Sequence, residues 1–291
     1  MPDTNPKRLF KRVGLIAKPG DGRVKSILPP LIKLLQTRGV EVVFDDTCSK
    51  ILGSSACDTV SPGDENDLVI AIGGDGTLLR AAHELSSYEV RLLGVNLGHL
   101  GFLTDISPDE IHERLTEILN GEYIEEQRAV LACSVMRDQK PLAHHDALND
   151  VVIHKWNIAR VIRFDTYING KFVHSQRSDG VIVSTPTGST AYALSGGGPL
   201  LDPSLDVILL VPICTHTLSN RPIVVGASSR IEIVVGTRNM HHARLTCDGA
   251  VKFELAPGDR VLVEKADRCI HLIHPPQHDH YATLRAKLRW G

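Results

Sequence analysis

A glycine-rich turn between an apolar run and an amphipathic segment constrains the fold of this chain more than any other feature. Residues 68–72 have the composition of a buried strand, and residues 77–85 have that of a helix. Between them stands Gly73-Gly74-Asp75-Gly76-Thr77. Glycines allow positive φ angles and a close approach to a ligand, while the amides at a helix start attract an anion. The turn therefore predicts a cradle for a phosphate or a nucleotide.

Asp75 is the unusual member of this turn, because a phosphate site ordinarily favours positive charge. An acid at this position can remove a proton or hold a metal. The alternative is a tight turn whose aspartate only caps the following helix. The motif by itself leaves both interpretations open.

Length and composition limit the classes of protein to consider. A chain of 291 residues favours two domains, and its net charge of -2 argues against a broad surface for polyanions, so no nucleic-acid partner is expected. The N-terminal segment is polar, and no apolar run approaches the ~20 residues that span a bilayer, so no membrane anchor is expected. Six cysteines without a C-x-x-C pair indicate a reducing compartment, and we expect a cytoplasmic location.

The first part of the chain alternates strands and helices, which predicts an α/β N-terminal domain with an open, mostly parallel sheet. Further strands are expected at residues 12–17, 40–44 and 91–95. One helix is expected to begin at Pro29-Pro30 and end at Arg38 before Gly39, and another to span residues 108–120 before Gly121. Residues 48–65 are predicted to form a loop region with room for one helical turn.

From Tyr123 onward the pattern predicts a β-rich, sandwich-like C-terminal domain. Asn169-Gly170 and Asp248-Gly249 each separate two strand-like runs, as in hairpins. After Pro275-Pro276 a short helical pattern is expected to dock back on the first domain, because it is too short to fold alone. The predicted boundaries are residues 1–122 for the nucleotide-binding domain, with 276–291 docking back, and 123–275 for the substrate-binding domain.

Residues 178–199 concentrate short hydroxyl side chains and glycines around a strand-to-helix turn. Hydroxyls and free backbone amides suit ribose and phosphate oxygens, and Tyr192 offers an apolar face for a base. The alternative is a loop rich in Ser and Thr, capped at Thr190.

The chain resembles the NAD kinase family, the ATP-dependent 2′-kinases of NAD. Besides residues 73–77, the resemblance rests on residues 94–104 (GVNLGHLGFLT), 147–154 (ALNDVVIH), 176–199 and 216–222 (HTLSNRP), in this order. It implies an α/β domain joined to a sandwich-like domain, NAD and ATP as substrates, and a homo-oligomer, either a dimer or a tetramer.

By this resemblance Asp75 is the base that takes the proton from the adenosine 2′-hydroxyl of NAD, which attacks the γ-phosphate of ATP. A divalent cation, Mg²⁺, is expected to arrive on the ATP, so no metal ligand is assigned to the protein. The amides of Gly74 and Gly76 would stabilise the transferring phosphoryl group. The other matched binding positions are Arg80, Asn149, Asp150, Arg160, Arg177, Asp179, Thr187, Thr190, Ala191, Tyr192 and Ser195.

Three positions depart from the family pattern. Asp150 replaces the usual Glu, Thr215 the usual Pro, and Ala250 a Gln that contacts substrate in many members. Arg177 is expected to select NAD over NADH, with Asp179 neutralising its guanidinium.

Four histidines near the C-terminus, His271, His274, His278 and His280, invite a zinc interpretation. No cysteine or acid stands at ligand spacing from them, so the sequence predicts no structural zinc site. Two other functions remain open: a lipid kinase, which shares the Gly-Gly-Asp-Gly turn, and a dinucleotide-binding regulator without catalysis. The hydroxyl-rich stretch argues against the first, and Asp75 argues against the second.

Overall fold

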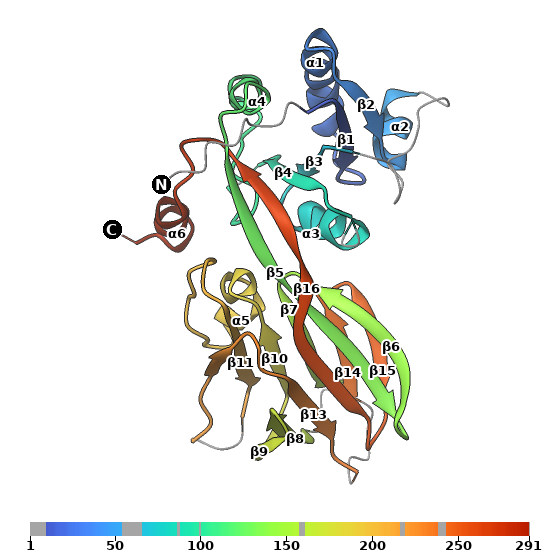
Figure 1. Ribbon diagram of the computed structural model, residues 1–291, viewed down its shortest axis with the longest axis vertical. Helices are drawn as coiled ribbons and strands as arrows, with labels where there is room; N and C mark the ends of the chain where they lie inside the picture. The colour runs from blue at the N-terminus through green and yellow to red at the C-terminus, as the bar shows by residue number, and fades with distance from the viewer. Residues whose placement is uncertain are drawn as a thin grey trace. The chain divides into compact units, whose positions relative to one another are not determined.

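The computed structural model describes residues 10–53, 66–85, 88–98, 100–156, 161–215, 219–237 and 243–290, except for the side chains of residues 251 and 252. The chain divides into two compact units (Figure 1). Unit 1 contains residues 1–127 and 270–291, and unit 2 contains residues 128–269. The functional domain boundaries expected from the sequence stay a prediction.

Unit 1 is built on a parallel sheet with strand order β2 (Glu41–Phe44), β1 (Arg12–Ala17), β3 (Leu68–Gly73) and β4 (Arg91–Asn96). The C-terminal end of β16 (Arg260–His274) continues this sheet, because residues 271–273 pair in parallel with β4. The strands carry almost unbroken apolar runs, as expected where both faces are covered. The predicted α/β class with a mostly parallel sheet is confirmed.

The first helix, α1 (Val24–Thr37), begins before the expected start, so the two prolines lie inside it. The prediction placed Pro29 and Pro30 in the first turn, where a missing N–H has no cost. The helix forms five residues earlier because Val24, Ile27 and Leu28 bury its first turns against the core. Tertiary burial therefore outweighs the two lost backbone hydrogen bonds. Gly39 terminates the helix with φ +71°, as predicted.

The expected loop after β2 begins with a seven-residue helix, α2 (Asp46–Leu52). Asp45 caps it by accepting a 2.8 Å hydrogen bond from the Cys48 N–H. Residues 54–65 lie outside the described part of the chain. The remaining helices of this part are α3 (Asp75–Glu84) and α4 (Ile111–Leu119), which begins three residues later than expected and ends before Gly121.

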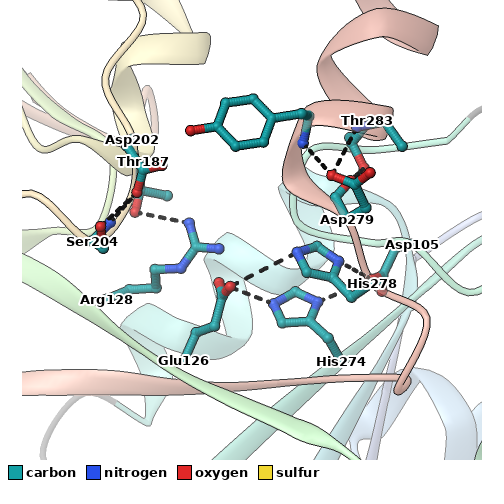
Figure 2. Close-up of polar contacts among 12 residues, drawn as sticks. Asp105, Glu126, Arg128, Thr187, Asp202, Ser204, His274, His278, Asp279 and Thr283 are labelled. Atoms are coloured by element: carbon teal, nitrogen blue, oxygen red, sulfur yellow. Dashed lines mark hydrogen bonds and ion pairs between the residues drawn. The ribbon is translucent and has the colours of Figure 1, made fainter.

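The C-terminal segment returns to unit 1, as predicted, through α6 (His280–Leu288). Asp279 caps this helix by accepting hydrogen bonds from the backbone amides of Tyr281 and Ala282 (Figure 2). The ammonium of Lys287 lies 5.3 Å from the centre of the Phe102 ring, and Leu284 is buried. Tyr281 of the same helix is 58% exposed.

Unit 2 is a β-sandwich. One layer is an antiparallel sheet in the order β12 (Ile223–Gly226), β11 (Val207–Ile213), β10 (Gly180–Ser184), β7 (Asp150–Lys155), β14 (Ala243–Cys247) and β15 (Val251–Leu255). The other contains β9 (Lys171–Ser178), β8 (Ile162–Ile168), β13 (Ile231–Val235) and β16, with β5 (Ile124–Arg137) and β6 (Lys140–Ala147) beside β16. Alternate residues of both layers, such as Ile153, Phe164 and Ile233, form one apolar core. The predicted sandwich-like fold is confirmed.

Both predicted hairpins occur. Asn169 and Gly170 join β8 to β9 with φ angles of 51° and 74°, and Asp248 and Gly249 join β14 to β15 with 49° and 70°. Two successive positive φ angles match the tight turn that the right-handed twist of the strands requires. Among the described residues, no helix is both long and apolar enough to cross a membrane.

Candidate active site

The glycine turn joins β3 to α3 as predicted, but its glycines do not adopt the left-handed φ angles that the sequence suggested. Gly74 precedes the helix in an extended conformation with φ 163°, and Gly73 and Gly76 are not among the described positive-φ residues. A Cβ on Gly73 would lie 2.1 Å from Thr77 Oγ1, so close packing explains this glycine. A Cβ on Gly74 or Gly76 would meet no described atom within 4 Å. These two positions therefore leave open space in front of the helix start.

The carboxylate of Asp75 points to the segment 102–104 and not to the helix amides. One oxygen accepts a 2.9 Å hydrogen bond from the Phe102 N–H. The other accepts from the Leu103 N–H at 3.1 Å and from the Thr104 hydroxyl at 3.0 Å. No side-chain cap bond occurs at the start of α3. The interpretation of Asp75 as a simple helix cap is therefore wrong.

Gly101 makes this arrangement possible. A Cβ at this position would lie 2.0 Å from one oxygen of Asp75 and 2.3 Å from Thr104 Oγ1. Any other residue would thus displace the carboxylate. The segment that resembles the family at residues 94–104 is the part that positions Asp75.

Arg80 contacts protein oxygens, and its expected place at the nucleotide phosphates stays a prediction. Its guanidinium donates to the Ala17 carbonyl at 2.9 Å and to Asp45 at 3.2 Å. A longer contact of 3.3 Å reaches Glu84, one turn along α3. These bonds tie α3 to the end of β1, which is a structural role.

Unit 2 contains a cavity of about 600 Å³ that runs along β7, beside the start of β10 and the ends of β11 and β14. Five of the predicted binding residues line it: Asn149, Asp150, Asp179, Ala191 and Tyr192. The walls also include residues that sequence reasoning missed, namely His154, Lys155, Cys214, Thr246 and Asp248. The size suits one half of a dinucleotide.

Asp248 organises the entrance of β7. Its carboxylate accepts hydrogen bonds from the backbone amides of Leu148, Asn149 and Asp150 at 2.8, 2.8 and 3.0 Å. The sequence signal for it was the Asp-Gly pair of the hairpin, which predicted a turn and no further role. The β7–β14 pairing places Cys247 opposite Val151 and so brings the turn at Asp248 next to residues 148–150.

Asp150 is an acid of this cavity whose pKa is strongly raised. Burial and the nearby Asp248 raise its pKa from 3.8 to about 7, while a hydrogen bond from the Tyr192 N–H opposes the rise. The side chain is therefore close to half protonated at neutral pH and can either accept or donate a hydrogen bond.

Asn149 supplies a second polar group. Its side-chain oxygen is buried and has no hydrogen-bond partner in the described structure. A buried acceptor without a partner is costly, and a ligand hydroxyl would satisfy it. Asn149 and Asp150 thus present two adjacent polar groups to one cavity.

The environment of Arg177 differs from the expected one. Strand alternation on β9 buries Gln176 and exposes Arg177, which is not among the residues lining the cavity. Asp179 pairs with Lys155 at 2.6 Å, and its expected role of neutralising Arg177 stays a prediction. The cation that lines the cavity is Lys155.

The hydroxyl-rich stretch forms two short helices, η1 (Thr187–Thr190) and α5 (Tyr192–Ser195). Thr187 is buried, and Arg128 donates a 3.4 Å hydrogen bond to its hydroxyl (Figure 2). The Thr190 hydroxyl donates to the Thr187 carbonyl, so it does not cap the next helix, and Ser195 is exposed. Arg160 lies outside the described residues.

Comparisons with known proteins agree with these features. Two family models match, described as the ATP-NAD kinase N-terminal domain at residues 13–123 and the ATP-NAD kinase C-terminal domain at residues 148–275. The chain is 46% identical to the NAD kinase of Marinobacter nauticus, covering 97% of both chains, and 45% identical to that of Pseudomonas entomophila, covering 97% of this chain and 96% of the relative.

Two solved structures share the fold. An NAD kinase from Archaeoglobus fulgidus in complex with ATP has a TM-score of 0.76 at 26% identity, covering 96% of this chain and 98% of that one. A yeast NADH kinase complexed with NADH has a TM-score of 0.89 at 24% identity, covering 98% of this chain and 89% of that one. The family models, the relatives and the fold agree, and the chain belongs to the NAD kinase family of enzymes.

Proposed function

We propose that this NAD kinase transfers the γ-phosphoryl group of ATP to the 2′-hydroxyl of the adenosine ribose of NAD, with Asp75 as the proton acceptor. The observation that carries the proposal is the Asp75 carboxylate, which three donors from residues 102–104 hold at the start of α3. The open positions at Gly74 and Gly76 leave room beside it for phosphate groups.

Phosphoryl transfer depends mainly on in-line positioning and on neutralising charge. The helix-start amides would bind the transferring phosphoryl group, because they point outward from α3 with the positive end of its dipole. Because the transition state is loose and the proton leaves late, the fixed geometry of the Asp75 carboxylate matters more than its basicity.

The divalent cation expected for this reaction would be held by ATP and not by residues of the glycine turn. Asp75 is the only carboxylate of the turn 73–77, and both of its oxygens already accept hydrogen bonds. A carboxylate engaged in this way does not by itself form a site for Mg²⁺, which prefers several oxygen ligands and water. The phosphates of ATP would hold the cation, which supplies charge neutralisation when bound.

The cavity of unit 2 would bind part of NAD. The unpartnered oxygen of Asn149 and the near-neutral carboxyl of Asp150 match ribose hydroxyls, which donate and accept hydrogen bonds. Tyr192, 46% exposed at the rim, offers a ring for stacking. Asp150 is one methylene shorter than the family's Glu, and a bridging water can span that difference. Ala250 does not line the cavity, so the contact made by Gln in other members would fall to the backbone of Asp248-Gly249.

Incubation with ATP, Mg²⁺ and NAD tests the function directly. We expect NADP to form only when all three are present, measured with an NADP-specific dehydrogenase. Phosphorylation of a sphingoid base or a diacylglycerol in place of NAD would instead support a lipid kinase. NAD binding without any product would support a regulator.

We also propose a homo-oligomer, a dimer or a tetramer, in the cytoplasm. The edge strands β9 and β12 carry exposed apolar side chains, with Phe172 58% and Val224 45% exposed. Such edges are usually covered. Light scattering of the active enzyme is expected to give a mass of two or four chains, whereas a fully active monomer would contradict this.

A further inference from the structure

The C-terminal histidines form a cluster with acids that are remote in the sequence. His274 ends β16, and His278 follows the Pro275-Pro276 turn. The rings of these two histidines stack at a centroid distance of 3.9 Å with an angle of 23° between their planes. Figure 2 shows them lying between the carboxylates of Asp105 and Glu126. All four residues belong to unit 1.

Asp105 contacts the same nitrogen of both rings. Its Oδ2 lies 3.0 Å from Nδ1 of His274 and 2.7 Å from Nδ1 of His278, which are hydrogen-bond distances. A carboxylate only accepts, so each Nδ1 carries a proton and donates it. In a neutral imidazole the other nitrogen, Nε2, then has a free lone pair.

The two Nε2 atoms face the carboxylate of Glu126. They lie 3.5 and 3.9 Å from its two carboxylate oxygens, and neither has a hydrogen-bond partner in the described structure. Both side chains are buried, with 1% of His274 and 6% of His278 exposed. Two lone pairs turned toward a carboxylate repel it unless a proton or a metal cation lies between them.

These separations suit a metal. Ligand atoms about 2.0–2.1 Å from a tetrahedral ion lie about 3.4 Å from one another, so the 3.5 and 3.9 Å distances need only a small contraction. An acid that receives the Nδ1–H of a metal-binding histidine is the usual outer partner, because it sets the ring orientation and the tautomer. Asp105 does this for both rings.

We propose that His274 and His278, through their Nε2 atoms, and Glu126 bind a divalent transition metal, with Zn²⁺ as the best match, and that Asp105 positions the two rings. Two imidazoles and one carboxylate leave a coordination position for water, and imidazole nitrogen favours Zn²⁺ over Mg²⁺. The site lies apart from the nucleotide turn in sequence and would hold the segment before α6 against β5 and residue 105.

Metal analysis of the intact enzyme tests this site. The protein is stripped with a chelator, dialysed and titrated calorimetrically with Zn²⁺ in a buffer that contains excess Mg²⁺ and no nucleotide. We expect about one Zn²⁺ per chain and a rise in melting temperature on binding. Co²⁺ in its place should give the visible absorption of a nitrogen and oxygen site. No saturable binding, or a cobalt–thiolate charge-transfer band from a cysteine site, would overturn the proposal.

Matched variants locate the metal. His278→Gln and Glu126→Gln should abolish the high-affinity binding, whereas Asp105→Asn should weaken it about 10- to 100-fold, as expected for an outer partner. The control is His280→Gln, which removes a histidine of the same segment that lies outside the cluster. This variant should bind Zn²⁺ with the affinity of the parent protein. Circular dichroism of each stripped variant shows that it is folded. Unchanged affinity in both His278→Gln and Glu126→Gln would contradict the site.

Discussion

Replacing Asp75 with Asn is expected to lower the turnover number for NADP formation by about 10²-fold or more, while NAD still binds. The amide cannot take the proton of the 2′-hydroxyl. The Asn side chain also introduces an NH₂ group, which donates and cannot accept hydrogen bonds. This NH₂ group must face either the Phe102 N–H or the Leu103 N–H and Thr104 hydroxyl, which are themselves donors. Steady-state assays with ATP and Mg²⁺ give the turnover number, and calorimetry gives the affinity for NAD.

Two further variants separate the chemistry of Asp75 from its placement. Thr104→Val keeps the carboxylate and removes one of its three donors, so the loss should stay within about 10-fold. Gly101→Ala also keeps the carboxylate but places a Cβ 2.0 Å from its oxygen, and a displacement of that order should cost about 10- to 100-fold. Gly22→Ala, where a Cβ meets no described atom within 4 Å, is the control. Near-normal turnover in Asp75→Asn would rule out Asp75 as the proton acceptor.

Replacing Asp150 with Asn is expected to change how the stability of the protein depends on pH. In the folded protein the pKa of Asp150 is about 7, against 3.8 in the unfolded chain. Between these values the folded state holds a proton that the unfolded state has lost, so stability falls as the pH rises. The loss in the free energy of unfolding is on the order of 4 kcal/mol, and it is complete once the pH exceeds about 7.

The Asn variant lacks this titration and can still accept the hydrogen bond from the Tyr192 N–H. Relative to the parent it should become more stable as the pH rises from 5 to 8, with little further change above that. Urea unfolding at several pH values measures the difference. Asp138→Asn is the control, because Asp138 is exposed and its positive φ of 49° suits Asn equally well. Parallel stability profiles of the parent and Asp150→Asn would contradict the raised pKa.

Local sequence patterns predict much of the fold, since each depends on only a few neighbouring residues. The Asn169-Gly170 and Asp248-Gly249 hairpins follow from the backbone freedom of their turn residues, and the parallel strands follow from continuous apolar runs. The start of α1 was misjudged because the local preference of Pro29-Pro30 competes with burial of Val24, Ile27 and Leu28. Burial depends on which other elements pack against a segment, and helix propensity carries no information about them.

The sequence by itself determined the two fold classes, the glycine turn with its acid, the Asn149-Asp150 pair and, through the order of its motifs, the family. Only the tertiary structure decided what surrounds these residues. Residues 102–104 hold Asp75, Asp248 binds the amides of residues 148–150, and Lys155 forms an ion pair with Asp179. His274 meets Asp105 across 169 positions of the chain, so no local spacing could reveal the cluster. Hydrogen bonds and ion pairs act over a few ångströms in space, and strand pairing and helix packing decide which distant residues come within that range.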